Sequence, residues 1–302
     1  LFLSVLNKET GLQCEIEQLH LSWFGSQTAK KVRIRGIDSE SEIFSAEQII
    51  VSGSLPRLLL YRFPKSLTLT GWTLQIDESL SINSPSLYHL DPGSLLSKIE
   101  RSDITSELGS ITMKTIKGST LSVSGFYAKK TAQQLLIRAL TKENDIQGSV
   151  SVEGALSPHF LLNVQLSSVP ASLFKLFIAS PSIDRILSTE DLINLTAKAH
   201  QEKDSTLITL TTEGNQITAK LRGHIRDNTF LITQGGASSI VLQPAITSSI
   251  LSELLAVETS IRSKEAHLFI SDAKLPLSIS KWNSSEFSLQ ANLPQISVET
   301  SD

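Results

Sequence analysis

The sequence predicts a mainly β protein built on a largely antiparallel sheet with one apolar face and a few short inserted helices. Apolar and polar residues alternate over many short segments, as in strands with one dry and one wetted face. Turns rich in Gly, Asn, Asp and Ser separate these segments. Only 19% of residues are charged whereas 40% are hydrophobic, so Ser and Thr supply much of the polar surface.

The clearest strands lie in the second half of the chain. Four segments keep strict period-two alternation, and four shorter segments show weaker versions of it. The clear segments are residues 160–166, 193–199, 217–221 and 287–293, and the shorter ones are 121–123, 150–152, 268–270 and 275–279. Many strands of this kind indicate one sheet that grows by adding hairpins.

The first strand changes phase. Cys14 and Ile16 share one face, whereas Leu19, Leu21 and Trp23 fall on the other parity. A β-bulge near residues 17–18 returns all five side chains to one side and curves the sheet. We therefore predict a bulge at this point.

The sequence predicts four helical regions as insertions between strands. Residues 91–101 begin with Asp91 and Pro92, which suit an N-cap and a first helical position. Thr131 and Gln134 have capping-box spacing, which predicts a helix over 131–140. The third region is 243–255, which carries an apolar stripe. The fourth follows residues 169–170, is interrupted at Pro181 and continues as a second short helix through 186–187.

Composition excludes several classes of protein. A net charge of −3 with a pI near 6.1 argues against a general nucleic-acid binder. The single cysteine, Cys14, rules out an intramolecular disulfide and a cysteine-based metal site. No apolar run approaches the ~18 residues of a membrane span. The length suits two β-rich halves, residues 1–154 and 155–302, which share one continuous sheet.

No catalytic constellation stands out, so we predict a non-enzymatic protein with no metal and no cofactor. The six histidines are scattered, and no pair has helical i, i+4 spacing beside an acid. The glycine-containing turns lie between strands, whereas a phosphate loop needs a strand followed by a helix N-terminus. The segment SPS at 180–182 lacks the flanking glycines of a nucleophile elbow.

Two surface segments each allow two interpretations. Lys30, Lys31, Arg33 and Arg35 either contact an anionic partner or form the wet face of a strand, and the acids that follow favour the wet face. The segment 56–64, PRLLLYRFP, combines leucines with aromatic and basic residues, as at a membrane interface. The alternative, which we favour, is a turn of buried helix joining two strands.

The order of these segments resembles AsmA-like proteins of bacterial envelopes, particularly divergent members of the chlamydia and planctomycete group. The resemblance lies in LNKETGLQCEIEQLHLSWFGSQTAKKVRIRGI at residues 6–37, in 55–77, and in later blocks with VPASLFKLF and LQPAITSSILSELL. It rests on patterns of residue type. The opening LFLSVL is either the tail of an upstream membrane anchor or simply a first strand or helical turn.

The resemblance implies a long, curved antiparallel sheet, folded like a gutter or half-barrel with an apolar inner face. It implies lipid transport or outer-membrane biogenesis in the periplasm of a Gram-negative-type bacterium, anchored to the inner membrane upstream of residue 1. The implied ligand is a phospholipid or other acyl lipid, bound in a hydrophobic groove. Candidate groove residues are Trp23, Phe160, Leu162, Val164, Leu166, Ile193, Leu195, Ile217, Leu221, Phe287 and Leu289.

A second interpretation stays open at this stage. Alternation alone does not separate an open groove from a closed sandwich, in which the same side chains pack against each other. The chain then serves as a secreted or surface structural module. Trp23 and Phe24, in the turn before the basic strand, are expected to cap the open end of the apolar face.

Overall fold

The computed structural model describes most of the chain. Its described residues are 12–36, 42–61, 64–77, 102–114, 120–157, 159–171, 173, 192–214, 217–232, 238–244, 246–248, 260–277, 285–292 and 296–299. They fall into two compact units, residues 1–158 and 159–302. The predicted mainly β class, with a curved and mostly antiparallel sheet and short helices, is confirmed.

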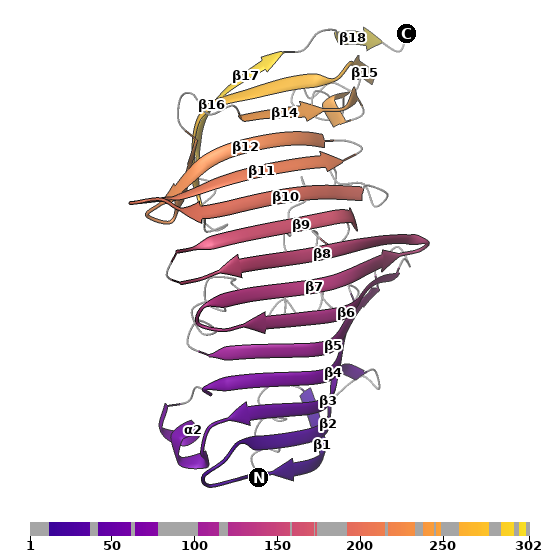
Figure 1. The fold of residues 1–302 in the computed structure, drawn as a ribbon. Helices are drawn as coiled ribbons and strands as arrows, with labels where there is room; N and C mark the ends of the chain where they lie inside the picture. Colours follow the sequence, from indigo (N-terminus) through magenta and orange to yellow (C-terminus); the bar gives the residue numbers. More distant parts are fainter. Residues whose placement is uncertain are drawn as a thin grey trace. The chain divides into compact units, whose positions relative to one another are not determined.

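Unit 1, residues 1–158, is a meandering sheet with one short helix among its described residues. Figure 1 shows its strands following one another in chain order. The strands are β1 (Leu12–His20), β2 (Gln27–Gly36), β3 (Glu42–Ser52), β4 (Ser66–Asp77), β5 (Asp103–Lys114), β6 (Thr120–Lys130), β7 (Gln134–Glu143) and β8 (Ile146–Ala155), and the helix is α2 (Leu55–Tyr61). Neighbouring strands pair antiparallel except β4 and β5, which are parallel.

A row of left-handed residues crosses unit 1. Lys31 in β2, Gly71 in β4, Leu108 in β5 and Gly125 in β6 have φ values between 51° and 58°. None of the four is paired with a residue of either neighbouring strand, although pairing continues on both sides of it. A left-handed residue in a strand changes which side the following side chains face. We call these four residues the switch row.

The switch row keeps one face of unit 1 apolar although the parity of the apolar residues changes. Trp72 shows this directly. Its Nε1 donates a hydrogen bond to Ser106 Oγ at 2.6 Å, and its ring also lies where a side chain at Gly109 would be placed. Ser106 and Gly109 are three residues apart and would face opposite sides of a regular strand. Leu108 between them reverses the parity, so both face Trp72.

The glycines of the switch row provide a matched test of this conformation. Gly125 has φ +58° with open space where a Cβ would lie, whereas a Cβ at Gly71 would meet Glu47 Cδ at 2.5 Å. Gly125→Ala is expected to lower the free energy of unfolding by about 1–2 kcal/mol through backbone strain alone. Gly71→Ala is expected to lower it further, because the Glu47 side chain must also move.

Chemical denaturation of the full chain measures both effects. Gly125→Asn serves as the control, because asparagine tolerates the left-handed region better than alanine. Equal stability of the alanine variants and the parent chain would show that the switch row is not left-handed in solution.

Unit 2, residues 159–302, is also a sheet with mostly sequential pairing. Its described strands are β9 (Leu161–Pro170), β10 (Leu192–Gln201), β11 (Thr206–Gly214), β12 (Ile217–Arg226), β13 (Thr229–Ile232), β14 (Ser238–Leu242), β15 (Ser260–Ser263), β16 (Ala266–Pro276), β17 (Glu286–Asn292) and β18 (Ile296–Glu299). From β9 to β12 each strand pairs antiparallel with the next.

Two short strands share one position in unit 2. β13 pairs with the end of β12, and β14 pairs with its beginning. Both then pair with β16, which also pairs with β17. A separate ribbon joins β15 to β18.

The helix predicted over 131–140 is wrong, because residues 134–143 form β7. Thr131 Oγ1 accepts hydrogen bonds from the backbone N–H groups of Gln133 and Gln134, at 3.3 and 3.1 Å. Thr131 N also donates to Gln134 O at 2.8 Å, which closes a hairpin turn. The capping signal was therefore real, but it caps a turn between strands.

The prediction of a β-bulge in the first strand is also wrong, because β1 has no extra residue relative to β2. β1 pairs with β2 without a register shift, from Leu12 opposite Gly36 to His20 opposite Thr28. The irregularity lies instead on β2, where Lys31 adopts φ 51°. Because one strand twists locally while the pairing continues, no extra residue is inserted.

The other predicted helices are only partly described. The segment 56–64 forms α2 through Tyr61, so the predicted helix between two strands is confirmed. The prediction that this helix is buried is wrong, because Leu59 and Leu60 are exposed on it. Residues 244 and 246–248 are helical at the start of the predicted 243–255 helix, as is residue 173 after β9. Residues 91–101 and 186–187 lie outside the described residues.

Candidate functional site

The predicted groove residues of β9, β10 and β12 come together on one face of unit 2. Pairing aligns them in rungs across four strands. The rungs run Leu166–Leu195–Thr212–Ala219, Val164–Ala197–Leu210–Leu221 and Leu162–Ala199–Ile208–Gly223. We call this surface the unit 2 apolar face and define it by Leu162, Val164, Leu166, Leu195, Leu210 and Leu221.

The unit 2 apolar face is only half-buried. Each of its six defining side chains has intermediate exposure. Their strand neighbours Asn163, Gln165 and Thr196 point the other way. This is the alternation of a sheet with one apolar and one polar face.

The remaining predicted residues lie elsewhere. Phe160 precedes β9, and Ile193 pairs with Val169 beyond an irregularity where Ser168 N donates to Asn194 Oδ1 at 2.8 Å. Ile217 pairs with Leu242 of β14. Phe287 and Leu289 are exposed on β17. Trp23 belongs to unit 1 and is exposed in the turn between β1 and β2.

Unit 1 has an apolar face that the sequence interpretation identified only in part, through the alternating segment 121–123. Its centre is Trp72, which is 8% exposed and packs edge-on against Phe126 with ring centroids 5.3 Å apart. Other buried side chains on its strands are Val32, Ala46, Met113, Leu121, Val123, Ala139 and Thr141. The switch row breaks the alternation that makes such a face visible in a sequence.

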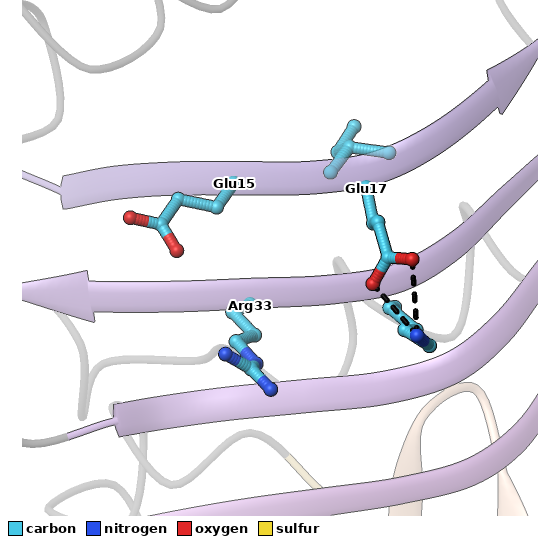
Figure 2. A pocket seen from close by; sticks show the side chains of 5 residues that line it. Glu15, Glu17 and Arg33 are labelled. Carbon is cyan, nitrogen blue, oxygen red and sulfur yellow. Dashed lines mark hydrogen bonds and ion pairs between the residues drawn. The ribbon is translucent and has the colours of Figure 1, made fainter.

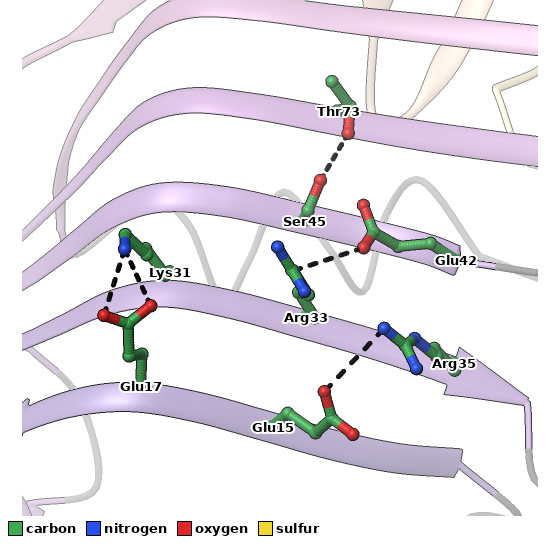
Figure 3. Close-up of polar contacts among 8 residues, drawn as sticks. All are labelled: Glu15, Glu17, Lys31, Arg33, Arg35, Glu42, Ser45 and Thr73. Atoms are coloured by element: carbon green, nitrogen blue, oxygen red, sulfur yellow. Dashed lines mark hydrogen bonds and ion pairs between the residues drawn. The ribbon is translucent and has the colours of Figure 1, made fainter.

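Three residues of the basic run, Lys31, Arg33 and Arg35, lie on the opposite, polar face of unit 1 and are paired with acids. Figure 3 shows Lys31 against Glu17, Arg33 against Glu42 and Arg35 against Glu15. The nitrogen–oxygen distances are 2.8, 3.6 and 3.9 Å respectively. Val32 on the same strand is buried on the other side. The interpretation as the wet face of a strand is therefore confirmed.

A shallow pocket of about 250 Å³ lies on this polar face. Figure 2 shows the side chains of Glu15, Glu17 and Arg33 around it, and Lys31 and Ile16 complete the lining. Its charged groups are already in partly exposed ion pairs, Lys31 with Glu17, Glu15 with Arg35 and Arg33 with Glu42. Because Ile16 is the only uncharged residue in its lining, the pocket suits an acyl chain poorly.

A cluster of polar residues at the β10–β11 turn resembles a catalytic arrangement only in composition. Ser205 Oγ lies 3.4 Å from His224 Nδ1, and Glu202 Oε2 lies 3.6 Å from the same nitrogen. A Ser–His–acid relay needs the serine and the acid on different ring nitrogens. The cluster therefore lacks the geometry of a nucleophilic triad.

Within the described ranges we find neither a metal-binding cluster nor a helix that could span a membrane. Within them, no group of three or more His, Cys, Asp or Glu side chains is arranged to hold a metal ion. None of the helices in that part of the chain is both long and apolar enough to cross a bilayer.

Cys14 provides a chemical probe of β1. Partial burial and, second, the negative charge of Glu15 raise the pKa of its thiol above the ordinary value. Because a higher pKa leaves less thiolate at a given pH, the pH profile of alkylation by iodoacetamide is expected to shift to higher pH in the folded chain than in urea. Glu15→Gln is expected to reverse part of the shift. A folded-state profile at or below the unfolded one would contradict this environment.

Comparisons with known proteins identify no relative. No family model matches the chain, and neither a curated protein nor a solved structure matches it.

Proposed function

We propose that the chain is a non-enzymatic lipid-binding protein of the bacterial envelope, in which the unit 2 apolar face shields acyl chains from water. The observation that carries this proposal is the set of aligned apolar rungs on β9–β12, whose side chains are largely half-buried. A core residue is usually almost fully buried, whereas a side chain that contacts a ligand stays partly accessible without it.

The physical basis of binding is the hydrophobic effect. Each methylene removed from water contributes about 0.8 kcal/mol. A chain lying across the rungs contacts Leu166, Leu195, Val164 and Leu221 in turn, while the polar headgroup stays in water. No catalytic group is needed for this role, and transfer of lipid along the sheet is passive.

The resemblance to AsmA-like proteins supports the same proposal at the level of cellular role. It adds a periplasmic location and a part in lipid transport or outer-membrane biogenesis. It rests on residue patterns, so the biochemical proposal is built on the unit 2 apolar face.

A structural or interaction protein with a self-packed core is the second candidate. The observation that favours it lies in unit 1, where Leu121, Val123 and Thr141 are almost completely buried. Their face behaves as a core, and we place no lipid site there. The two candidate functions therefore differ in the role of unit 2, whose apolar face either binds acyl lipid or packs as part of a protein core.

Binding of a fluorescent fatty acid to lipid-stripped protein tests the proposal. We expect saturable binding that long-chain fatty acid or phospholipid displaces and that a short-chain acid displaces poorly, because affinity grows with each buried methylene. Absence of saturable binding, or equal displacement by short and long acids, would contradict it.

A further inference from the structure

We propose that the turn between β1 and β2, together with α2, docks on the surface of an anionic lipid bilayer. The proposed surface consists of Leu21, Trp23, Phe24, Leu59 and Leu60, which we call the turn–helix patch. It lies in unit 1 and does not depend on acyl-chain binding by unit 2.

All five side chains of the turn–helix patch are exposed. Phe24 is 97% exposed, Leu60 77% and Trp23 63%, although residues of these types are normally buried. An exposed group of large apolar side chains marks a protein or membrane contact. Trp and Phe beside Leu are typical of segments that insert into the interfacial region of a bilayer.

Hydrogen bonds hold the turn and the helix together. Leu55 N, at the start of α2, donates to Ser22 O in the turn at 3.3 Å. The buried Gln27 side chain connects the same two segments, because its Nε2 lies 2.7 Å from Ser22 O and 2.9 Å from Gly53 O. Its Oε1 accepts from Ser22 N at 2.7 Å. These bonds therefore hold the two apolar segments next to each other.

The charges around the patch favour an anionic partner. Residues 18–30 and 48–70 contain Lys30, Arg57, Arg62 and Lys65 but no Asp or Glu, although the whole chain has a net charge of −3. Arg57 lies on α2, and Arg57 and Lys65 are exposed. Each basic residue near an anionic membrane surface contributes about 1 kcal/mol to binding. Aromatic, aliphatic and basic side chains together match a bilayer better than they match an apolar protein surface.

Flotation of the 302-residue chain with vesicles tests this proposal. We expect association with vesicles of phosphatidylcholine and phosphatidylglycerol that exceeds association with phosphatidylcholine alone and falls as salt is added. Trp23→Ser with Phe24→Ser is expected to weaken the partition coefficient by roughly tenfold or more for each aromatic removed. Leu59→Ser with Leu60→Ser is expected to have a similar effect.

Further variants test the contribution of the basic residues and the specificity of the apolar ones. Arg57→Gln with Lys65→Gln is expected to weaken binding by roughly fivefold per charge, on the phosphatidylglycerol vesicles only. Leu140→Ser is the matched control, because Leu140 is an exposed leucine on β7. It is expected to bind as the parent chain does. Tryptophan emission should shift to the blue on binding, and Trp23→Phe should remove that shift.

Three results would overturn the proposal. They are no association with the anionic vesicles, association unchanged in both apolar double variants, or self-association of the parent chain that the variants abolish without any vesicle binding. The last result would identify a second copy of the chain as the partner. Binding of the fluorescent fatty acid without vesicles, measured on the same variants, reports separately on unit 2.

Discussion

Trp72→Ala is expected to lower the free energy of unfolding by about 3–5 kcal/mol, as measured by chemical denaturation. The indole of Trp72 is buried and packs against Phe126 at an interplanar angle of 71°. Its removal leaves a cavity at the switch row and also leaves Ser106 Oγ without its 2.6 Å partner. Both effects destabilise the same face of unit 1.

The matched control is Trp23→Ala, which removes the same side chain from an exposed position. We expect it to change the free energy of unfolding by about 0.5 kcal/mol or less. Ser106→Ala should lie between the two, at about 1–3 kcal/mol, because the buried Nε1–H then has no acceptor. Similar losses for the two tryptophan variants would show that Trp72 is not at the centre of a packed face.

Leu195→Asp is expected to weaken binding of the fluorescent fatty acid by roughly 100-fold. Leu195 lies in the middle of the unit 2 apolar face, opposite Leu166 on β9 and Thr212 on β11. The substitution removes apolar contact and places a carboxylate where the acyl chain would otherwise exclude water.

Thr196→Asp is the matched control, because it adds the same charge to the next residue, which points to the other face. We expect it to leave probe binding unchanged. The stability of Leu195→Asp separates the two proposed roles of unit 2. An accessible face predicts a loss of about 1 kcal/mol or less, whereas a self-packed core predicts the several kcal/mol of a buried charge.

The strands of unit 2 could be predicted because nothing interrupts their alternation. Leu162, Val164 and Leu166 on β9 keep one parity and meet the same parity on β10. Period-two patterning also led to the correct fold class. The same pattern placed Phe287 and Leu289 on a strand, but it carries no information about their exposure on β17.

The apolar face of unit 1 could not be predicted in the same way. Gly71 and Gly125 are compatible with a left-handed conformation, but glycine occurs in strands for other reasons. Lys31 and Leu108 give no signal at all, because neither residue favours positive φ. Because the side chains change sides at these positions, alternation in the sequence does not show that Trp72 and Ser106 lie on the same face.

The turn at Thr131 illustrates a different limit. Thr131 and Gln134 have the spacing of a helix cap, and Thr131 Oγ1 does accept backbone hydrogen bonds. The same local interaction serves helix starts and hairpin turns. Pairing of β7 with β6 and β8 selects the hairpin turn over the helix. That pairing involves residues outside a short sequence window around Thr131.

Native mass spectrometry of the chain purified from bacteria examines lipid binding by the unit 2 apolar face without any added probe. We expect the parent chain and Thr196→Asp to carry bound phospholipid or fatty acid, and Leu195→Asp to carry much less. A parent chain that is free of lipid, and that also takes up none when acyl lipid is added, would contradict the proposed function of this face.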